Sequence, residues 1–491
     1  MGGLEWRAGP GADRTSGTAG NDHPNRFATK PNEPPTRARI CQRPPACRRG
    51  KWRDGALRRS ATLGAVTTRR PLRARLATTV SRGAAALSRA TGRGDGSVIG
   101  GRLGLIIDPD LLAHLAAGRQ VALVSGTNGK TTTTRLTAAA IGVLGPVATN
   151  SYGANMPTGH TSALAKAGET PYAVLEVDEH YLPQVLAATG PRVIALLNLS
   201  RDQLDRAKEV AMMAQLWRDA LRNRPVHLVA NADDPMVVWA ASVGTAVTWV
   251  AAGQRWHDDS WVCPECGGAI ARAGEGNAGE PNLASGGGKP DADWHCTSCA
   301  LRRPSPQWTL DGDAVVAPDG ARYPVHLQLP GRVNRANAAT ALAVAAQFGV
   351  APADALPRLA DVASIAGRYA QVERDGRAIR LLLAKNPAGW LEAFDMADRA
   401  PTLLSINARD PDGLDTSWLF DVDFAPLAGR QVLITGDRAY DLAVRLEVNE
   451  VPFRHVPTFA DAVAAVPPGR LEVIANYTAF QDIRAELDRV N

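Results

Sequence analysis

The sequence predicts an α/β protein with a phosphate-binding central domain, a metal-binding insertion and a smaller second α/β domain. Three observations lead to this prediction. Short apolar runs alternate with helical segments, a glycine-rich turn containing Gly-Lys-Thr follows the first run, and two Cys-x-x-Cys pairs lie farther along the chain. Alternating strands and helices are typical of doubly wound parallel sheets.

The composition is that of an ordinary globular protein of about three domains, with 491 residues, 45% apolar and 21% charged. No run approaches 18 apolar residues, so we expect no transmembrane helix. Residues 1–100 hold 20 Lys and Arg against 6 Asp and Glu, whereas the other 391 hold 35 against 43. The body is therefore acidic, which disfavours nucleic-acid binding because a phosphate backbone needs a basic face.

Residues 1–67 are predicted to form a disordered, Arg-rich tail, because their apolar residues are too few and too irregularly spaced to offset the entropy of ordering. A transit peptide or a nucleic-acid arm would have such a composition. We favour a third interpretation, an extension without function that arises from a start codon placed too far upstream. Cys41 and Cys47 lie in this tail and receive no role.

The central domain is expected to span residues 68–365. Leu72 to Arg89 predicts a helix that ends at a Gly-rich run, and a second helix is expected from Asp108 to Gly118. The apolar run Val121–Val124 is short and β-branched, as in a buried parallel strand. Further strands are expected at 173–177, 193–197 and 226–230, before an insertion at about 255–308.

The glycine-rich turn has the context of a phosphate-binding loop, because it stands between the Val121–Val124 strand and a helix. Backbone N–H groups of such a loop converge on phosphate oxygens, helped by the helix N-terminus. Lys130 is expected to reach the β/γ-phosphates and the Thr131 hydroxyl to bind Mg²⁺. Val124 departs from the general pattern, which has glycine there. The predicted nucleotide-binding residues are Gly126, Thr127, Asn128, Gly129, Lys130, Thr131 and Thr132.

This loop resembles that of the Mur ligase family and its folylpolyglutamate synthetase relatives, in which ATP phosphorylates a carboxylate and an amine attacks the acyl phosphate. Four further motifs follow in the family's order: Leu175-Glu176-Val177-Asp178-Glu179, Asn231-Ala232-Asp233-Asp234-Pro235, the Asn334-x-x-Asn337 helix start, and Gly367-Arg368. The resemblance implies that Glu176 binds Mg²⁺ and that Asn231, Asp234, Asn337 and Arg368 contribute to the nucleotide site. The end of a strand is also where an open α/β sheet binds ligands, which supports Glu176 independently.

The sequence is less specific about three further residues near these motifs. Asp178 and Glu179 are expected to be outer or surface groups. Gln203 stands where the family carries a metal-side His, which leaves a second Mg²⁺ site open.

Cys263, Cys266, Cys296 and Cys299 form two Cys-x-x-Cys pairs separated by 29 residues. Four thiolates so paired predict a closed, structural Zn²⁺ site. The spacer is longer than usual, but its Gly-rich middle can loop out. A disulfide or redox role is the less favoured alternative.

Residues 366–491 are expected to form the smaller α/β domain, with strands near 379–384, 402–406, 431–435 and 471–475. Lys385 follows the first of these runs, either facing the nucleotide or as a solvated loop residue. The segment 407–424 is rich in carboxylates and lacks the order of an EF-hand loop, which disfavours Ca²⁺. It resembles the C-terminal domain of the MurT family, and this likeness covers about residues 70–491.

In the MurT family the ligase-like subunit pairs with GatD, a glutamine amidotransferase with a Cys and a His. The resemblance implies that this chain supplies Asp412 or Asp415 to orient that His, as triad chemistry requires. We favour Asp415 slightly, and expect Asp421 and Asp423 to be structural.

The implied activity is Mg²⁺- and ATP-dependent amidation of the D-isoglutamate α-carboxylate in the lipid II stem peptide, with ammonia from GatD. The expected location is cytoplasmic, at the inner face of the plasma membrane. A stand-alone Mur or folylpolyglutamate synthetase-like amino-acid ligase is the main alternative, and a zinc-containing nucleic-acid binder is a second. The preferred acceptor (lipid I, lipid II or a soluble precursor) is left open.

Overall fold

The computed structural model describes residues 70–92, 96–150, 154–201, 210–273, 293–363, 369–397 and 399–490. The chain divides into Met1–Gly64 and Ala65–Asn491, and every described residue belongs to the second unit. The predicted tail at 1–67 and Arg368 lie outside the described residues. Among the described helices, none is long and apolar enough to cross a membrane.

The larger sheet confirms the doubly wound α/β prediction. Its nine strands lie in the order β11-β10-β9-β6-β5-β4-β1-β3-β2, and β6 through β2 are parallel. Each strand expected in this domain is present. The parallel strands are β1 (Gln120–Ser125), β2 (Val147–Thr149), β3 (Tyr172–Val177), β4 (Val193–Leu196), β5 (His227–Asn231) and β6 (Ala246–Ala251), followed by β9 (Trp308–Asp311), β10 (Ala314–Val316) and β11 (Arg322–Pro324).

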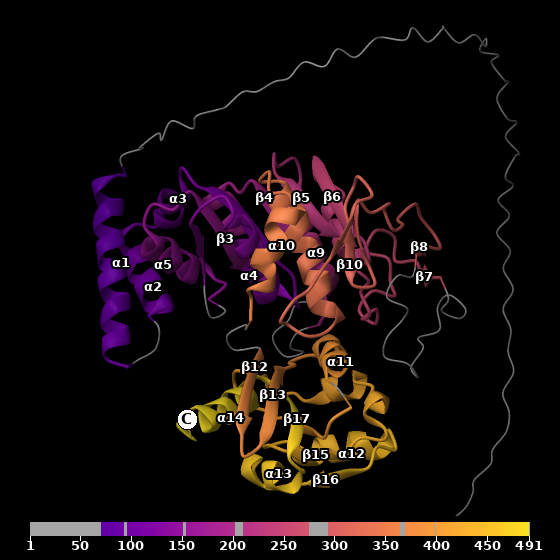
Figure 1. Cartoon of the computed structure of the whole chain (residues 1–491). Helices are drawn as coiled ribbons and strands as arrows, with labels where there is room; N and C mark the ends of the chain where they lie inside the picture. Colours follow the sequence, from indigo (N-terminus) through magenta and orange to yellow (C-terminus); the bar gives the residue numbers. More distant parts are fainter. Residues whose placement is uncertain are drawn as a thin grey trace, which may run out of the picture. The chain divides into compact units, whose positions relative to one another are not determined.

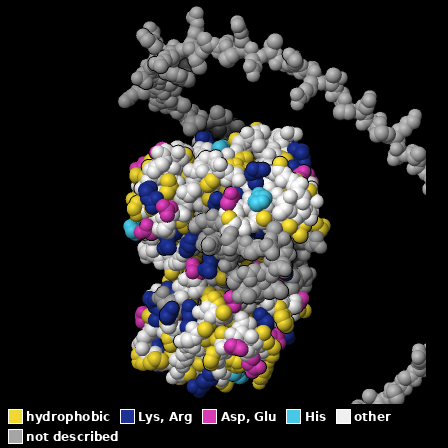
Figure 2. Space-filling model, turned by 90° about the vertical axis from the view of Figure 1, so that its right-hand side faces the viewer, with side chains coloured by type: hydrophobic (Ala, Val, Ile, Leu, Met, Phe, Trp, Pro, Cys, Tyr) yellow, Lys and Arg dark blue, Asp and Glu magenta, His cyan; other side chains and the backbone are white. Residues whose placement is uncertain are grey.

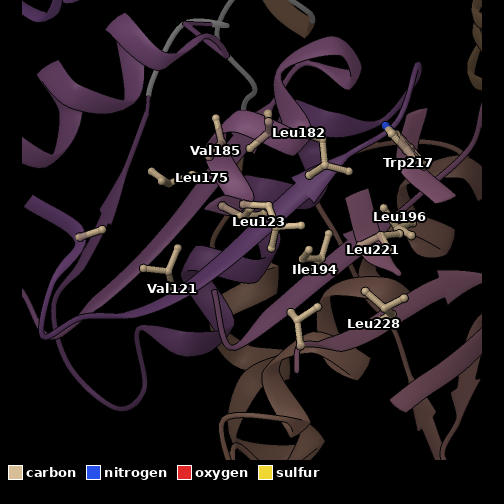
Figure 3. Packing of buried hydrophobic residues seen from close by; sticks show 14 of the residues in the cluster. Val121, Leu123, Leu175, Leu182, Val185, Ile194, Leu196, Trp217, Leu221 and Leu228 are labelled. Atoms are coloured by element: carbon tan, nitrogen blue, oxygen red, sulfur yellow. The ribbon is translucent and has the colours of Figure 1, made fainter. Parts of the chain in front are cut away.

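Helices cover both faces of this sheet (Figure 1). Because side chains alternate along a strand, Val121 and Leu123 of β1 enter one core while Ala122 and Val124 enter the other. In Figure 3 the first core packs against Trp217 and other residues of α6 (Leu182–Thr189) and α7 (Val210–Leu221). The second core lies under α4 (Lys130–Ile141), α9 (Arg332–Ala346) and α10 (Pro352–Ala360). Because these strands are buried on both faces, their sequences are continuous apolar runs.

Three helices precede β1 among the described residues, one more than the sequence predicts. α1 (Leu72–Ala90) and α3 (Leu111–Ala116) match the two expected helices, but α2 (Ser97–Ile107) was missed. Its three glycines lower the helix propensity, yet they are what lets it pack. A Cβ on Gly100 would lie 2.6 Å from the Ser81 carbonyl oxygen, so this face accepts no side chain. α5 (Pro157–Ala167) completes the group (Figure 1).

The insertion lies between adjacent parallel strands, since β6 pairs with β9. Within it, β7 (Ile270–Arg272) and β8 (Trp294–Cys296) form a two-stranded antiparallel ribbon. α8 (Pro235–Ala241) lies beneath this ribbon, with Val238 in its small core.

The C-terminal residues form a second α/β layer structure, as expected. Six strands lie in the order β12-β13-β17-β14-β15-β16, with all but β12 parallel. The strands are β12 (Tyr369–Arg374), β13 (Arg377–Leu383), β14 (Thr402–Ser405), β15 (Val432–Thr435), β16 (Phe453–His455) and β17 (Gly469–Ala475). α11 (Pro387–Met396) and α12 (Ala439–Val448) cover one face, and α13 (Phe459–Ala465) and α14 (Tyr477–Val490) the other.

Charged side chains of both signs are interspersed on the face of the molecule that Figure 2 shows, without a broad basic field. This distribution differs from the basic stripe that a nucleic-acid interface requires.

Candidate functional site

The glycine-rich loop joins β1 to α4, as the sequence predicted. Gly129 has φ 82°, and a Cβ there would lie 2.7 Å from Asn337 Oδ1. Gly126 has φ 146° and would clash with Leu197. Both positions therefore require glycine. Asn198, which follows β4, fixes the loop: Asn128 N donates to its Oδ1 at 2.8 Å, and Thr127 N donates to its carbonyl oxygen at 2.9 Å.

Lys130 is the first residue of α4 and only 3% exposed. Its Nζ donates to the carbonyl oxygens of Gly126 (2.6 Å) and Thr127 (3.1 Å) and pairs with Glu179 Oε1 at 3.0 Å. We expect Glu179 to be an outer or a surface group, and its mostly buried carboxylate beside this lysine excludes the surface position. The ammonium therefore already lies at the loop, where it can form an ion pair with a bound phosphate.

Two side-chain oxygens beside the loop fit a divalent cation. Thr131 Oγ1 and Glu176 Oε1 are both buried, and neither has a hydrogen-bond partner among the described residues. A buried oxygen without a partner is energetically costly, and hydroxyl and carboxylate oxygens are ligands that Mg²⁺ accepts. The donor set thus fits the Mg²⁺ site predicted for these two residues.

Asn150 and His160, which the sequence did not single out, hold Glu176 in place. Asn150 Oδ1 accepts from Glu176 N at 2.8 Å, and its Nδ2 donates to the Glu176 carbonyl at 2.9 Å. His160 Nε2 donates to the same carbonyl at 2.6 Å, since a carbonyl can only accept. Burial lowers the pKa of His160 to about 4, so the ring is neutral. These contacts fix the backbone of the glutamate rather than its carboxylate.

A small pocket lies on the side of the loop expected to bind the nucleoside. Asn231, Asp233, Gln254 and Asn337 line it, together with Arg332 and Glu392. Asn337 also accepts from Thr133 Oγ1 at 3.2 Å, so it joins the pocket to α4.

Asp234, which we predicted for the nucleotide site, has a different set of contacts. Its carboxylate is fully buried and accepts from the N–H groups of Met236 and Val237 at the start of α8 and from Leu199 N at 2.8 Å. Burial, the largest effect, raises its pKa. Asp234 therefore caps a helix, and Asn231 and Asp233 are the residues of this motif that line the pocket.

The four cysteines predicted to bind zinc come together. Their sulfur atoms all lie within 4.8 Å of one another. Cys263 Sγ lies 3.7 Å from Cys299 Sγ, and Cys266 Sγ lies 3.5 Å from Cys296 Sγ. Tetrahedral zinc with Zn–S bonds of about 2.3 Å separates its sulfur ligands by about 3.8 Å. The cluster fits one structural Zn²⁺ ion.

The ribbon braces the nucleotide pocket. Trp294 Nε1 donates to the Ala232 carbonyl at 3.0 Å, and Arg303 donates to Asp233 Oδ1 at 2.6 Å. Asp233 Oδ2 in turn accepts from Gly253 N at 2.7 Å. Residues of the insertion therefore fix the turn after β5 through hydrogen bonds to Ala232 and Asp233.

We expect Cys296→Ser to lose the zinc, lower the melting temperature by about 5 °C or more, and raise KM for ATP about tenfold. The reason is that the Trp294 and Arg303 contacts depend on the ribbon. Zinc content by elemental analysis, a thermal melt and ATP kinetics check this, with Cys41→Ser as the control. An unchanged KM for ATP in a zinc-free, folded variant would contradict the bracing role.

In the C-terminal domain the structure gives Asp412 and Asp415 different surroundings. Asp412 accepts from Thr478 N at 2.8 Å and from the Thr478 hydroxyl, so it satisfies an amide in the first turn of α14. Asp415 is exposed, and its Oδ1 accepts from Ser417 N at 2.8 Å. This hydrogen bond is the main reason that the pKa of Asp415 is lowered, which keeps it ionised. Asp415 is thus available to a partner, whereas Asp412 is used within the fold.

Exposed apolar residues lie in the segment 407–424 that contains Asp415 and on α12, which contacts this segment. Tyr440, Val444 and Val448 lie four residues apart on one face of α12 and are each more than half exposed. Arg445 connects this helix to the Asp415 segment, donating to the Leu419 and Phe420 carbonyls. Leu414 and Phe420 are exposed as well. Such apolar patches are typical of protein interaction sites.

Two protein-family models match separate parts of the chain. The Mur ligase middle domain matches residues 124–258, and the MurT ligase C-terminal domain matches residues 383–480. These ranges contain the phosphate loop and the Asp415 segment, respectively.

Named relatives align over most of the chain. The lipid II isoglutaminyl synthase (glutamine-hydrolyzing) subunit MurT of Staphylococcus aureus (strain COL) is 28% identical over 433 residues, covering 82% of this chain and 95% of that protein. The same subunit of Streptococcus pneumoniae (strain ATCC BAA-255 / R6) is 28% identical over 426 residues, covering 80% and 92%.

Solved structures show the same fold. MurF from Acinetobacter baumannii is similar with a TM-score of 0.55 at 17% identity, covering 79% of this chain and 80% of that one. A pseudomurein peptide ligase type C from Methanothermus fervidus is similar with a TM-score of 0.55 at 17% identity, covering 76% and 79%.

Proposed function

We propose that this chain is the synthetase subunit of a lipid II isoglutaminyl synthase, a Mur ligase-type, ATP-dependent ligase. The support is its 28% identity to two MurT subunits over 80% or more of the chain and its matches to the Mur ligase middle domain and the MurT ligase C-terminal domain. Its substrate is then the α-carboxylate of D-isoglutamate in the lipid II stem peptide, and its product is the D-isoglutamine amide. The observation that carries the proposal is the joint presence of the Lys130 loop and the exposed Asp415 segment in one chain.

The reaction divides into two displacements. A carboxylate oxygen of the substrate forms a bond to the γ-phosphorus of ATP as the bond to the ADP oxygen breaks, which gives an acyl phosphate. Ammonia then attacks the acyl carbon with its lone pair, phosphate leaves, and the nitrogen loses a proton. The enzyme's work in both steps is positioning and charge stabilisation.

Each residue of the loop site has a role in this scheme. Lys130 stabilises the negative charge on the transferred phosphoryl group, since its ammonium already lies over the loop. Backbone amides at the start of α4 hold the phosphates. Thr131 and Glu176 hold Mg²⁺, which neutralises phosphate charge when bound. Asn337 and Asp233 contact the nucleoside, and Zn²⁺ holds the ribbon that supports Asp233. Arg368 remains a predicted nucleotide contact.

The ammonia source is proposed to be a GatD-type glutaminase bound as a heterodimer on the C-terminal domain. The described residues carry four cysteines, and all of them belong to the zinc cluster, so a glutaminase nucleophile is expected from a second chain. The exposed apolar residues of α12 and of the segment 407–424 offer a docking face. Because its substrate is lipid-linked, we propose that the cytoplasmic enzyme works at the inner face of the plasma membrane.

Co-expression with a GatD-type glutaminase tests the proposal. We expect the full chain to co-purify with the glutaminase and to convert lipid II to its amide with glutamine and ATP, as detected by mass spectrometry. If no complex forms and ATP hydrolysis is instead stimulated by an amino acid alone, the chain is the stand-alone ligase and the proposal is wrong.

A further inference from the structure

A cavity lies away from the phosphate loop, among α1, α2, α5 and the edge strand β2. Its volume is about 730 Å³, within the range of small-molecule sites. Figure 1 shows these helices side by side at one end of the large sheet. The Mg²⁺ and nucleotide roles proposed above do not use this cavity.

Cationic side chains line the cavity, and no Asp or Glu is present among the described residues of its lining. Arg82 and Arg89 lie seven residues apart on α1 and so share a face. Lys166 joins them from α5. Small polar groups, including Ser162 and Asn150, line the interior. This combination suits a ligand with several negative charges and hydrogen-bonding sugar or amide groups.

The cavity is connected to the candidate Mg²⁺ site through Asn150. This residue lines the cavity and holds the Glu176 backbone through two hydrogen bonds. A ligand bound in the cavity would therefore lie beside a residue that positions Glu176.

The outer surface of the helices is apolar, which the sequence did not reveal. Val98, Ile99, Leu103 and Ile106 of α2 are between 40% and 67% exposed, because its glycine face is the one that packs inward. Leu76 and Leu87 of α1, eleven residues apart and so on one face, are also more than half exposed. Exposed apolar residues beside cations are typical of surfaces that lie on anionic membranes.

We infer that this cavity binds the diphosphate-linked sugar of the acceptor substrate, with Arg89 and Lys166 neutralising the diphosphate. The inference rests on the proposed function for the identity of the acceptor. The same chemistry occurs in a lipid-linked precursor and in a soluble uridine diphosphate-linked precursor. The apolar face of α2 favours the lipid-linked form.

Charge reversal tests the site without relying on catalysis. We expect Arg89→Glu/Lys166→Glu in the full chain to weaken binding of UDP-N-acetylmuramic acid about tenfold or more by titration calorimetry. In ammonia-dependent assays KM for lipid II should rise by a similar factor while KM for ATP is unchanged. Arg358→Glu is the matched control, because this exposed α10 residue does not line the cavity. Thermal melts verify that each variant is folded.

A second variant separates the two sources of the ligand. Ile99→Ser/Ile106→Ser should raise KM for lipid II in vesicles several-fold and leave the affinity for UDP-N-acetylmuramic acid unchanged. Equal affinities of the charge-reversed variant, Arg358→Glu and wild type would overturn the inference. If the wild type binds the probe through Arg89 and Lys166 but does not amidate lipid II, the proposed function fails and the cavity assignment stands.

Discussion

Lys130→Ala is expected to lower the rate of ATP-dependent amide formation about 10³-fold or more, with glutamine and with ammonia alike. Lys130 is 3% exposed, and its ammonium lies at the carbonyl oxygens of the loop. Stabilisation of charge is stronger in a buried site than in water, and loss of one such group typically lowers the catalytic rate 10²- to 10³-fold or more. Single-turnover formation of ADP and amide measures the effect.

The Glu179 ion pair makes a control necessary. Lys130→Ala leaves the mostly buried Glu179 carboxylate without this partner, which destabilises the fold. Lys130→Ala/Glu179→Gln removes that unpaired charge. If the double variant regains the melting temperature but not the rate, the lysine acts on the phosphates. Recovery of both would mean that the lysine only balances Glu179, and the proposed role would be wrong.

Local patterns accounted for most of the fold. The parallel strands are buried on both faces, so each one is a short apolar run visible in the sequence. The loop before α4 depends on glycines whose positive φ angles only a few residues adopt. α2 was missed because its glycines oppose a helix locally and are favourable only once Ser81 and Thr158 pack against them.

The surroundings of several site residues depend on long-range contacts that the sequence does not show. Glu179 follows β3 by two residues, and nothing near it shows that the chain turns back to Lys130, 49 positions away. Asn150 and His160 act on Glu176 from other elements, so no motif contains them together. The sequence alone does not distinguish the roles of Asp412 and Asp415. The contact of Asp412 with Thr478, 66 residues later, distinguishes them in the structure.

That separation leads to the second large effect. Asp415→Asn is expected to lower glutamine-dependent amidation about 10³-fold or more and to leave ammonia-dependent amidation within about twofold. An ionised carboxylate that orients a partner's His loses this ability as an amide, and in such triads the loss is about 10⁴-fold. The ATP site, by contrast, contains no contact of Asp415. Steady-state rates with glutamine and with ammonium chloride measure both arms.

Asp412→Asn provides the matched control, because it makes the same chemical change three residues away. Its carboxylate satisfies the Thr478 amide, so we expect a loss of stability of about 1 kcal/mol. Both ammonia and glutamine rates should persist in the folded variant. If Asp412→Asn loses only glutamine use while Asp415→Asn keeps it, the carboxylate assignment is reversed. If neither variant distinguishes the two nitrogen sources, the partner's triad is complete without this chain, and the exposed Asp415 serves only to hold the Ser417 turn.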